Sequence, residues 1–364
     1  MARLRFAVVT VVGLSCVAWG EPITPPTQAS SGPGGVEAAH SSVVSHKYAE
    51  GAGEYWIYEP SGPRPESAPL VVFSHGWGAM APAPYAGWIE HIVRRGAIVV
   101  YPRYQESLRT PRREFLPNEV GAVHAAIKEL QTGDHVKPEL DHVAFVGHSM
   151  GGALTANLAA VAADEGLPAP KAIMSVEPGA SLKGQEDVDG ALEDLSRVPA
   201  GTLALVIVGD QDRVVGDTLA RMIFEGLTKI GSKDKDFVKM VSDDHGSPAL
   251  VADHTAPTSP IGMGAGRGAD DDAAPADGAR GGALRERLRK RLEKRRQDAD
   301  AGGVDRTINA LDYYGTWKLF DALCDAAFTG KNREYALGDT PEQRYMGVWS
   351  DGTPVKELVV TDEP

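Results

Sequence analysis

The sequence has little cysteine, no long hydrophobic run and no excess of positive charge. Only two of its 364 residues are cysteines. The apolar run Phe6–Ala18 is too short and too interrupted to span a membrane. The formal net charge is −13, which argues against a general nucleic-acid binder. With 42% hydrophobic and 24% charged residues, the composition is that of a soluble globular protein.

Residues 1–20 have the pattern of a secretory signal peptide. Arg3 and Arg5 provide a positive start, and an apolar run follows them. Ala18 and Gly20 place small residues three positions and one position before the predicted cleavage site. We therefore expect a secreted or periplasmic protein.

The two cysteines add little to this interpretation. A lipid anchor at Cys16 is the less favoured alternative, because Gly13 stands where a lipid-attachment signal usually has leucine. Removal of the signal leaves Cys324 alone, so no intramolecular disulfide can form. We expect Cys324 to be a buried helix residue.

Composition divides the rest of the chain into four segments. Residues 21–46 are rich in Pro, Gly and Ser and predict a flexible leader, and residues 47–256 form the predicted core. An insertion is expected at 257–304, and a final core helix with a tail at 305–364. In the core, apolar strands alternate with helical patterns, which predicts an α/β fold with a doubly wound, mostly parallel sheet. Ligands of such sheets bind beyond the carboxyl ends of the strands.

The predicted insertion has two halves. The first is low in complexity, with mainly Gly, Ala, Asp and Pro, and the second contains a strong helix former at 283–297. Basic residues crowd positions 285–296 around a narrow leucine stripe. The simplest interpretation is a solvated helix. An alternative is a contact with an anionic surface, or a mobile flap near the site.

The stretch Val143–Ala159 predicts a buried strand, a sharp turn and a helix. Ser149 lies at the apex of the turn, within Gly147-His-Ser-Met-Gly151. Small residues two positions before and after the serine allow a strained turn that projects its hydroxyl. The following helix directs its positive end at the apex, which favours an anion there. Ser149 is therefore the candidate nucleophile.

A serine nucleophile needs a base, and the base needs an acid that orients it. We favour Asp212 as the acid, because it lies on the loop after the predicted strand Thr202–Val208. Asp210 and Glu177, which also follow predicted strands, are alternatives. Asp210 and Asp212 could instead cap the next helix, as Asp217 could.

The favoured base is His245, which directly follows the predicted strand Phe237–Ser242. Its place after the serine and the acid in the chain matches the order Ser, Asp, His. His254, further along the same loop, is the rival. We expect His148 to be structural, since neighbouring side chains on a sharp turn diverge. We expect His75 to organise its own loop rather than to act as a base.

The developing oxyanion needs backbone donors. We expect them to be the N–H groups of Met150, which follows the nucleophile, and of Trp77, in the loop His75-Gly-Trp-Gly78. The Trp77 ring could also form an aromatic wall for a substrate group, or could simply pack.

These motifs, in this order, resemble the α/β-hydrolase superfamily. The resemblance covers about Tyr55–His254 plus the final helix, and includes the acid loop Gly209-Asp-Gln-Asp-Arg-Val-Val215. Within the superfamily the chain is most similar to esterases related to chlorophyllases, cutinase-like polyester hydrolases and platelet-activating-factor acetylhydrolases. It departs from them in its long insertion and in the absence of a disulfide pair.

The resemblance implies a single catalytic domain that cleaves carboxylic esters through an acyl-enzyme, without a metal or another cofactor. The expected partner is a small or polymeric ester, and not nucleic acid. A lipase, a thioesterase or a peptidase could use the same residues. The chain could also be a binding protein that keeps the fold without catalysis, or a surface-attached protein that acts through the basic helix at 285–296.

Overall fold

The centre of the molecule is a mixed β-sheet, seen in a computed structural model that describes residues 22–180, 190–259 and 307–364. Within these residues the strand order is β1-β2-β4-β3-β5-β6-β7-β8-β9. The strands are β1 (Ser42–Tyr48), β2 (Tyr55–Ser61), β3 (Ser67–Ser74), β4 (Ile98–Pro102), β5 (Lys137–His148), β6 (Ala172–Val176), β7 (Leu203–Gly209), β8 (Lys235–Met240) and β9 (Val359–Thr361).

Six neighbouring strands of this sheet, from β4 through β8, run parallel. The other neighbours, β1 with β2, β2 with β4 and β8 with β9, pair antiparallel. The prediction of a doubly wound, mostly parallel sheet is therefore confirmed. Because the parallel strands share one direction, the loops that follow them meet along one edge of the sheet.

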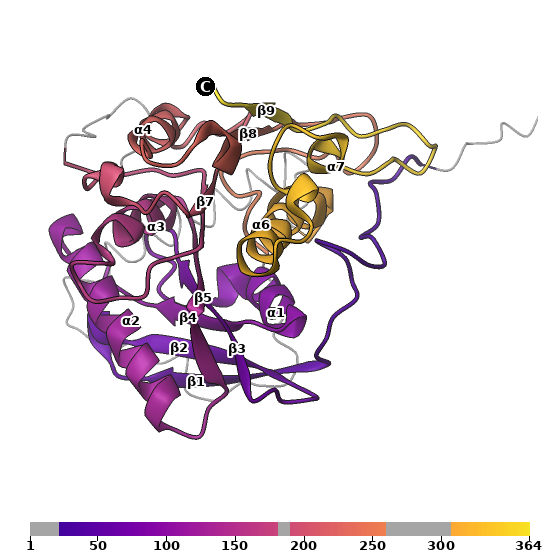
Figure 1. Cartoon of the computed structure of the whole chain (residues 1–364). Helices are drawn as coiled ribbons and strands as arrows, with labels where there is room; N and C mark the ends of the chain where they lie inside the picture. Colours follow the sequence, from indigo (N-terminus) through magenta and orange to yellow (C-terminus); the bar gives the residue numbers. More distant parts are fainter. Residues whose placement is uncertain (1–21, 181–189, 260–306) are drawn as a thin grey trace, which may run out of the picture.

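Helices cover both faces of the sheet. Figure 1 shows α2, α3 and α4 on one side and α1 and α6 on the other. The main helices are α1 (Ala86–Arg95), α2 (Phe115–Thr132), α3 (Met150–Val161), α4 (Thr218–Gly226), α6 (Lys318–Thr329) and the short α7 (Pro341–Arg344). A π-helical stretch, Leu311–Trp317, leads directly into α6.

Two hydrophobic cores result, one on each face of the sheet. Strand β3 contributes side chains to both cores, which explains why its sequence is apolar almost throughout. Leu70 and Val72 face the core under α2 and α3, whereas Val71 and Phe73 face the core under α1 and α6. All four side chains are buried. Successive strand residues point to opposite faces, so a strand covered on both sides needs apolar residues at every position.

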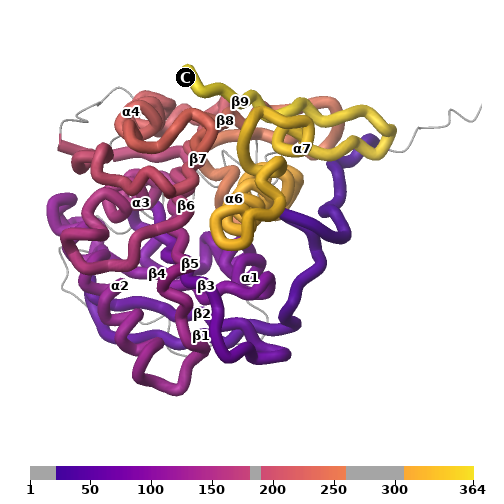
Figure 2. Tube along the Cα trace, viewed as in Figure 1, coloured from indigo at the N-terminus to yellow at the C-terminus, as the bar shows by residue number. Residues whose placement is uncertain are grey.

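The N-terminal residues differ from the sequence-based expectation. The prediction of an irregular leader is wrong at Ser42–His46, which form most of β1, and the first strand is not the one predicted at Glu54–Glu59. Upstream of β1, the N–H of Gly34 donates to Asp321 Oδ2 in α6 at 2.7 Å. Figure 2 shows this indigo segment running beside the yellow C-terminal elements. The segment is thus hydrogen-bonded to residues almost 300 positions later.

Several predictions fall outside the described residues. These are the signal peptide at 1–20 with Cys16, nearly all of the insertion at 257–304, and the basic helix at 285–296. Cys324 lies in α6, where burial raises the pKa of its thiol well above the ordinary value. In the described ranges, no helix is both long enough and apolar enough to cross a membrane.

Candidate active site

Ser149 lies on a strained turn between β5 and α3. Its backbone has φ 58° and ψ −123°, a conformation that residues other than glycine rarely adopt. Glycines two positions before and after Ser149 are required sterically. A Cβ on Gly147 would lie 2.3 Å from the carbonyl oxygen of Gly151, and one on Gly151 would lie 2.0 Å from that of Ser74. The predicted strand–turn–helix at this serine is present in the structure.

The side chains of Ser149, His254 and Asp212 form a hydrogen-bonded chain. His254 Nε2 lies 2.9 Å from Ser149 Oγ, and His254 Nδ1 lies 2.8 Å from Asp212 Oδ2. The three residues follow β5, β8 and β7, so they converge at the carboxyl edge of the parallel strands. The arrangement can activate a hydroxyl, because the imidazole can accept its proton while the carboxylate holds the ring.

The predicted position of His245 beside Ser149 is wrong. His245 Nε2 instead lies 2.8 Å from Asp351 Oδ2 in the C-terminal tail. The buried Asp243 explains this direction: it accepts hydrogen bonds from the N–H of His245, the indole N–H of Trp349 and the N–H of Lys356. These contacts hold the start of the loop against the tail.

The loop after β8 returns to the sheet before it reaches His254. Asp243 and Leu250 exchange backbone hydrogen bonds of 2.8 Å, and the N–H of Gln211 donates to the carbonyl oxygen of Ala252. These contacts bring His254, the second histidine of the loop, to hydrogen-bond distance of Asp212. In the sequence, His245 and His254 differ only in their distance from the predicted strand. No local sequence pattern predicts that the loop folds back to the sheet before His254.

Asp212 is fixed from both sides. Its Oδ1 accepts hydrogen bonds from the N–H groups of Val214 and Val215, and its Oδ2 contacts His254. Burial would raise the pKa of Asp212, but the hydrogen bond and charge of His254, together with the two N–H groups, outweigh it and lower the pKa. Asp210 instead accepts a hydrogen bond from Ser242 Oγ, so of the two loop aspartates it is Asp212 whose carboxylate meets the histidine.

The loop after β3 approaches Ser149 through Gly76. A Cβ on Gly76 would lie 3.4 Å from Ser149 Cβ. The N–H of Gly76 donates to Tyr85 Oη at 3.0 Å, and that of Gly78 donates to Gln105 Oε1 at 2.9 Å. No acceptor for the N–H of Trp77, the predicted oxyanion donor between them, occurs among the described residues.

Neighbouring aromatic rings support this loop. His75 stacks on Tyr104 with ring centroids 4.0 Å apart, and its Nε2 lies 2.7 Å from the carbonyl oxygen of Arg103. His75 thus organises its own loop, as expected. The Trp77 side chain is 55% exposed, so it does not pack in the core and is free to form a wall at the mouth of the site.

Two groups of described residues could hold a metal ion, with their potential ligand atoms within 4.8 Å of one another. In the first, His135 Nδ1 hydrogen-bonds Glu59 Oε2 and His46 lies 3.6 Å from the same oxygen. The second joins His148 and Glu177 to the histidine of the hydrogen-bonded chain, His254. The described residues include no further group of this kind, and the chemistry at Ser149 does not require an ion.

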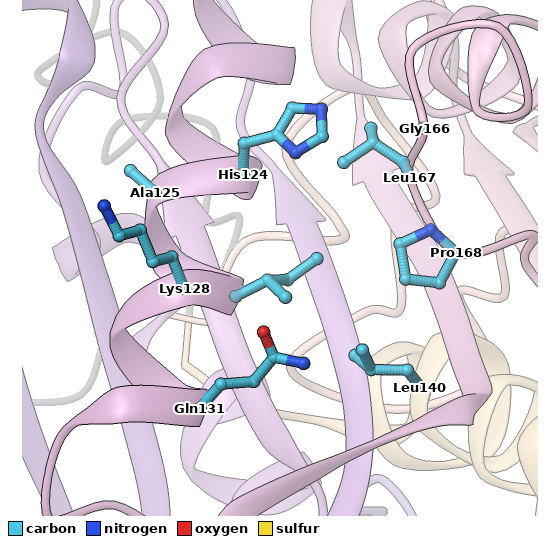
Figure 3. Close-up of a pocket in the computed structure, with 9 residues that line it drawn as sticks. His124, Ala125, Lys128, Gln131, Leu140, Gly166, Leu167 and Pro168 are labelled. Carbon is cyan, nitrogen blue, oxygen red and sulfur yellow. The ribbon is translucent and has the colours of Figure 1, made fainter.

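Two hollows of about 700 Å³ flank the α2 helix. One, of about 690 Å³, is lined by Arg112, Phe115, Met150 and Leu154, and Met150 directly follows Ser149. The other, shown in Figure 3, is lined by residues that include His124, Lys128, Gln131, Leu140 and Pro168. Leu140 stands near the start of β5, whereas Ser149 follows its end. Of these two hollows, only the one lined by Met150 adjoins the candidate site.

Comparisons with known proteins agree with this geometry. A family model described as an alpha/beta hydrolase fold matches residues 71–213, which include the loop after β3, Ser149 and Asp212. Among solved structures, fungal esterases from Rhizomucor miehei are 15% identical, with a TM-score of 0.44 over 56% of this chain and 77% of theirs. A variant of the esterase rPPE is 16% identical, with a TM-score of 0.44 over 57% of this chain and 76% of its own.

No curated protein matches the chain. The assignment therefore depends on the family match and the architecture, since likenesses at this level of structural similarity add no argument of their own. The sheet order, the turn at Ser149 and the match over residues 71–213 show that the chain has an α/β-hydrolase fold.

Proposed function

We propose that the protein is a serine hydrolase that cleaves carboxylic esters through an acyl-enzyme. The observation that supports this most strongly is the chain of two hydrogen bonds, 2.9 and 2.8 Å long, from Ser149 through His254 to Asp212. Such a chain provides a nucleophile, a base and an orienting acid.

In the proposed first step, Ser149 Oγ attacks the ester carbonyl carbon while His254 Nε2 takes the hydroxyl proton. The resulting oxyanion is bound by the N–H groups of Trp77 and Met150. His254 then gives the proton to the departing alcohol oxygen, which leaves an acyl group on Ser149. Water attacks the acyl carbon, again with His254 as base, and releases the carboxylic acid and the free serine.

The surroundings favour an ester with an apolar group. Phe115, Met150 and Leu154 line the hollow next to the nucleophile, and the exposed indole of Trp77 stands on the loop that approaches Ser149. A small or a polymeric ester fits this description. The pattern of residues 1–20 supports a further proposal, that the protein acts after export from the cytoplasm.

The test combines active-site labelling with an ester panel. A fluorophosphonate should add covalent mass at Ser149 of the wild type but not of Ser149→Ala, and p-nitrophenyl esters of graded chain length should be hydrolysed. Ser149→Ala should fold and lose about 10⁴-fold or more in kcat. Ser45→Ala, at an exposed serine of β1, is the matched control. A wild type that is neither labelled nor active on any ester would refute the proposal.

A further inference from the structure

Glu177 is a fully buried carboxyl beside the candidate base. It directly follows β6, its side chain is 0% exposed, and its backbone has a positive φ of 44°. Its Oε2 lies 3.6 Å from His254 Nδ1 and 3.5 Å from His148 Nε2. In the described part of the chain, neither carboxyl oxygen has a hydrogen-bond partner. A buried polar group without a partner is costly and needs an explanation.

The surrounding structure makes room for this carboxyl. A Cβ on Gly209, at the end of β7, would lie 2.6 Å from Glu177 Oε1, so a larger residue there would collide with the side chain. On the other side, His148 Nδ1 lies 2.9 Å from Tyr85 Oη, which accepts the N–H of Gly76. Glu177 therefore lies close to the candidate base and is linked through His148 and Tyr85 to the loop that approaches Ser149.

Two carboxyls thus flank one ring nitrogen. Asp212 Oδ2 lies 2.8 Å from His254 Nδ1, and Glu177 Oε2 lies 3.6 Å from the same atom. Burial raises the pKa of Glu177 well above its ordinary value, and the negative charges of Asp212 and Asp253 raise it further. The pKa of Asp212 is lowered, so of the two carboxyls Glu177 holds its proton more tightly.

We propose that Glu177 is a second positioning acid for His254, which takes over the orientation of the ring when the carboxylate of Asp212 is removed. The inference rests on the proposed function, because orientation of His254 matters only if it is the base. Removal of Asp212 opens space at Nδ1 and also removes the closest negative charge. Glu177 Oε2, which lies 3.6 Å from Nδ1, then has room to move to hydrogen-bond distance and to accept the N–H of the ring.

A double-mutant cycle tests the proposal, with kcat/KM on p-nitrophenyl acetate and the rate of fluorophosphonate labelling as readouts. Glu177→Gln keeps the shape of the side chain and leaves Asp212 on His254, so alone it should change both rates by about threefold or less. Asp212→Ala should lower them by about 10²-fold. In the Asp212→Ala background, Glu177→Gln should cost at least about tenfold more.

Asp212→Asn provides a control that leaves Glu177 untouched. The amide stays at Nδ1, so it excludes Glu177 and favours the wrong ring tautomer. It also preserves an oxygen for the N–H groups of Val214 and Val215. Asp212→Ala should nevertheless be the more active of the two variants, because the alanine admits Glu177 and imposes no wrong tautomer. Only the first of these advantages should be lost in the double variant with Glu177→Gln.

The split between kcat and KM separates positioning from packing. In the Asp212→Ala background, Glu177→Gln should lower kcat and leave KM within about twofold, because the orientation of His254 matters for the bound ester. A loss caused by disturbed packing would instead lower the free energy of unfolding, which urea denaturation measures.

Three outcomes would overturn the inference while the proposed function stands. They are a double variant as active as Asp212→Ala, an equal cost of Glu177→Gln in both backgrounds, and an Asp212→Asn variant at least as active as Asp212→Ala. The last comparison remains decisive even if Glu177→Gln fails to fold. Failure of the wild type to be labelled at all would instead refute the proposed function, and the inference with it.

Discussion

His254 Nε2 and Ser149 Oγ lie 2.9 Å apart, although 105 residues separate them along the chain. The contact exists because β5 and β8 end at the same edge of the sheet and the loop after β8 folds back toward it. The first histidine of that loop, His245, meets Asp351 instead. The two histidines should therefore differ sharply when each is replaced.

His254→Ala should lower kcat for ester hydrolysis by about 10³-fold or more, because the variant lacks a base for Ser149. His245→Ala, the matched control, removes only a contact with the tail and should keep kcat within about threefold of the wild type. Steady-state kinetics on folded variants, checked by circular dichroism, measures both. A larger loss of kcat in His245→Ala than in His254→Ala would assign the role of base to His245.

The turn at Ser149 should tolerate no side chain at Gly151, where a Cβ would lie 2.0 Å from the carbonyl oxygen of Ser74. Gly151→Ala should lower the free energy of unfolding by about 3 kcal/mol, since the backbone of β3 must shift. Gly121→Ala is the control, because a Cβ there meets nothing within 4 Å on the exposed side of α2. It should stabilise the helix by about 0.5–1 kcal/mol. Urea denaturation measures both changes, and equal effects would contradict the steric argument.

Glu119 should make stability depend on pH. The side chain is buried in α2 and accepts a hydrogen bond of 2.5 Å from Ser74 Oγ. Burial raises its pKa from 4.5 to about 7, although the hydrogen bond opposes the shift. The folded protein therefore binds this proton more tightly than the unfolded chain does. Its stabilising effect is complete below pH 4.5 and is lost as the pH rises through 7.

Glu119→Gln should remove this dependence, because the amide does not ionise. Between pH 5 and pH 8, the wild type should lose about 3 kcal/mol of unfolding free energy relative to the variant. Urea denaturation of both proteins at the two pH values gives the difference, in which the contributions of other titrating groups cancel. A difference that does not change with pH would show that Glu119 is not held protonated.

The segment before β1 should contribute to stability. Tyr313 Oη donates to the carbonyl oxygen of Pro26, and the N–H of Ser247 donates to that of Ile23 at 2.8 Å. Deletion of residues 22–36 breaks these contacts and should lower the thermal midpoint by about 5 °C or more. Removal of residues 362–364 is the control and should have little effect. An unchanged midpoint in the longer deletion would support the flexible leader that composition predicts.

Local sequence patterns were sufficient to predict the features that depend on neighbouring residues. Apolar strands alternating with helices predicted the parallel sheet, because a strand covered on both faces must be apolar throughout. Gly147 and Gly151 predicted the turn at Ser149, since the close approach of backbone atoms at such a turn requires glycine. The position of Asp212 on the loop after a strand made it the favoured acid, although Asp210 and Glu177 also follow predicted strands.

The contacts across the edge of the sheet could be seen only in the folded chain. His254 takes the place predicted for His245 because Asp243 ties the start of the loop to the tail, and neither residue has a local pattern that reveals this. Residues 22–41 looked like a flexible leader because their partners lie in the C-terminal part of the chain. Glu177 could be seen to follow a strand, but not to be buried without a partner beside His254. Each of these contacts joins segments far apart in sequence, and composition and periodicity report only on short-range order.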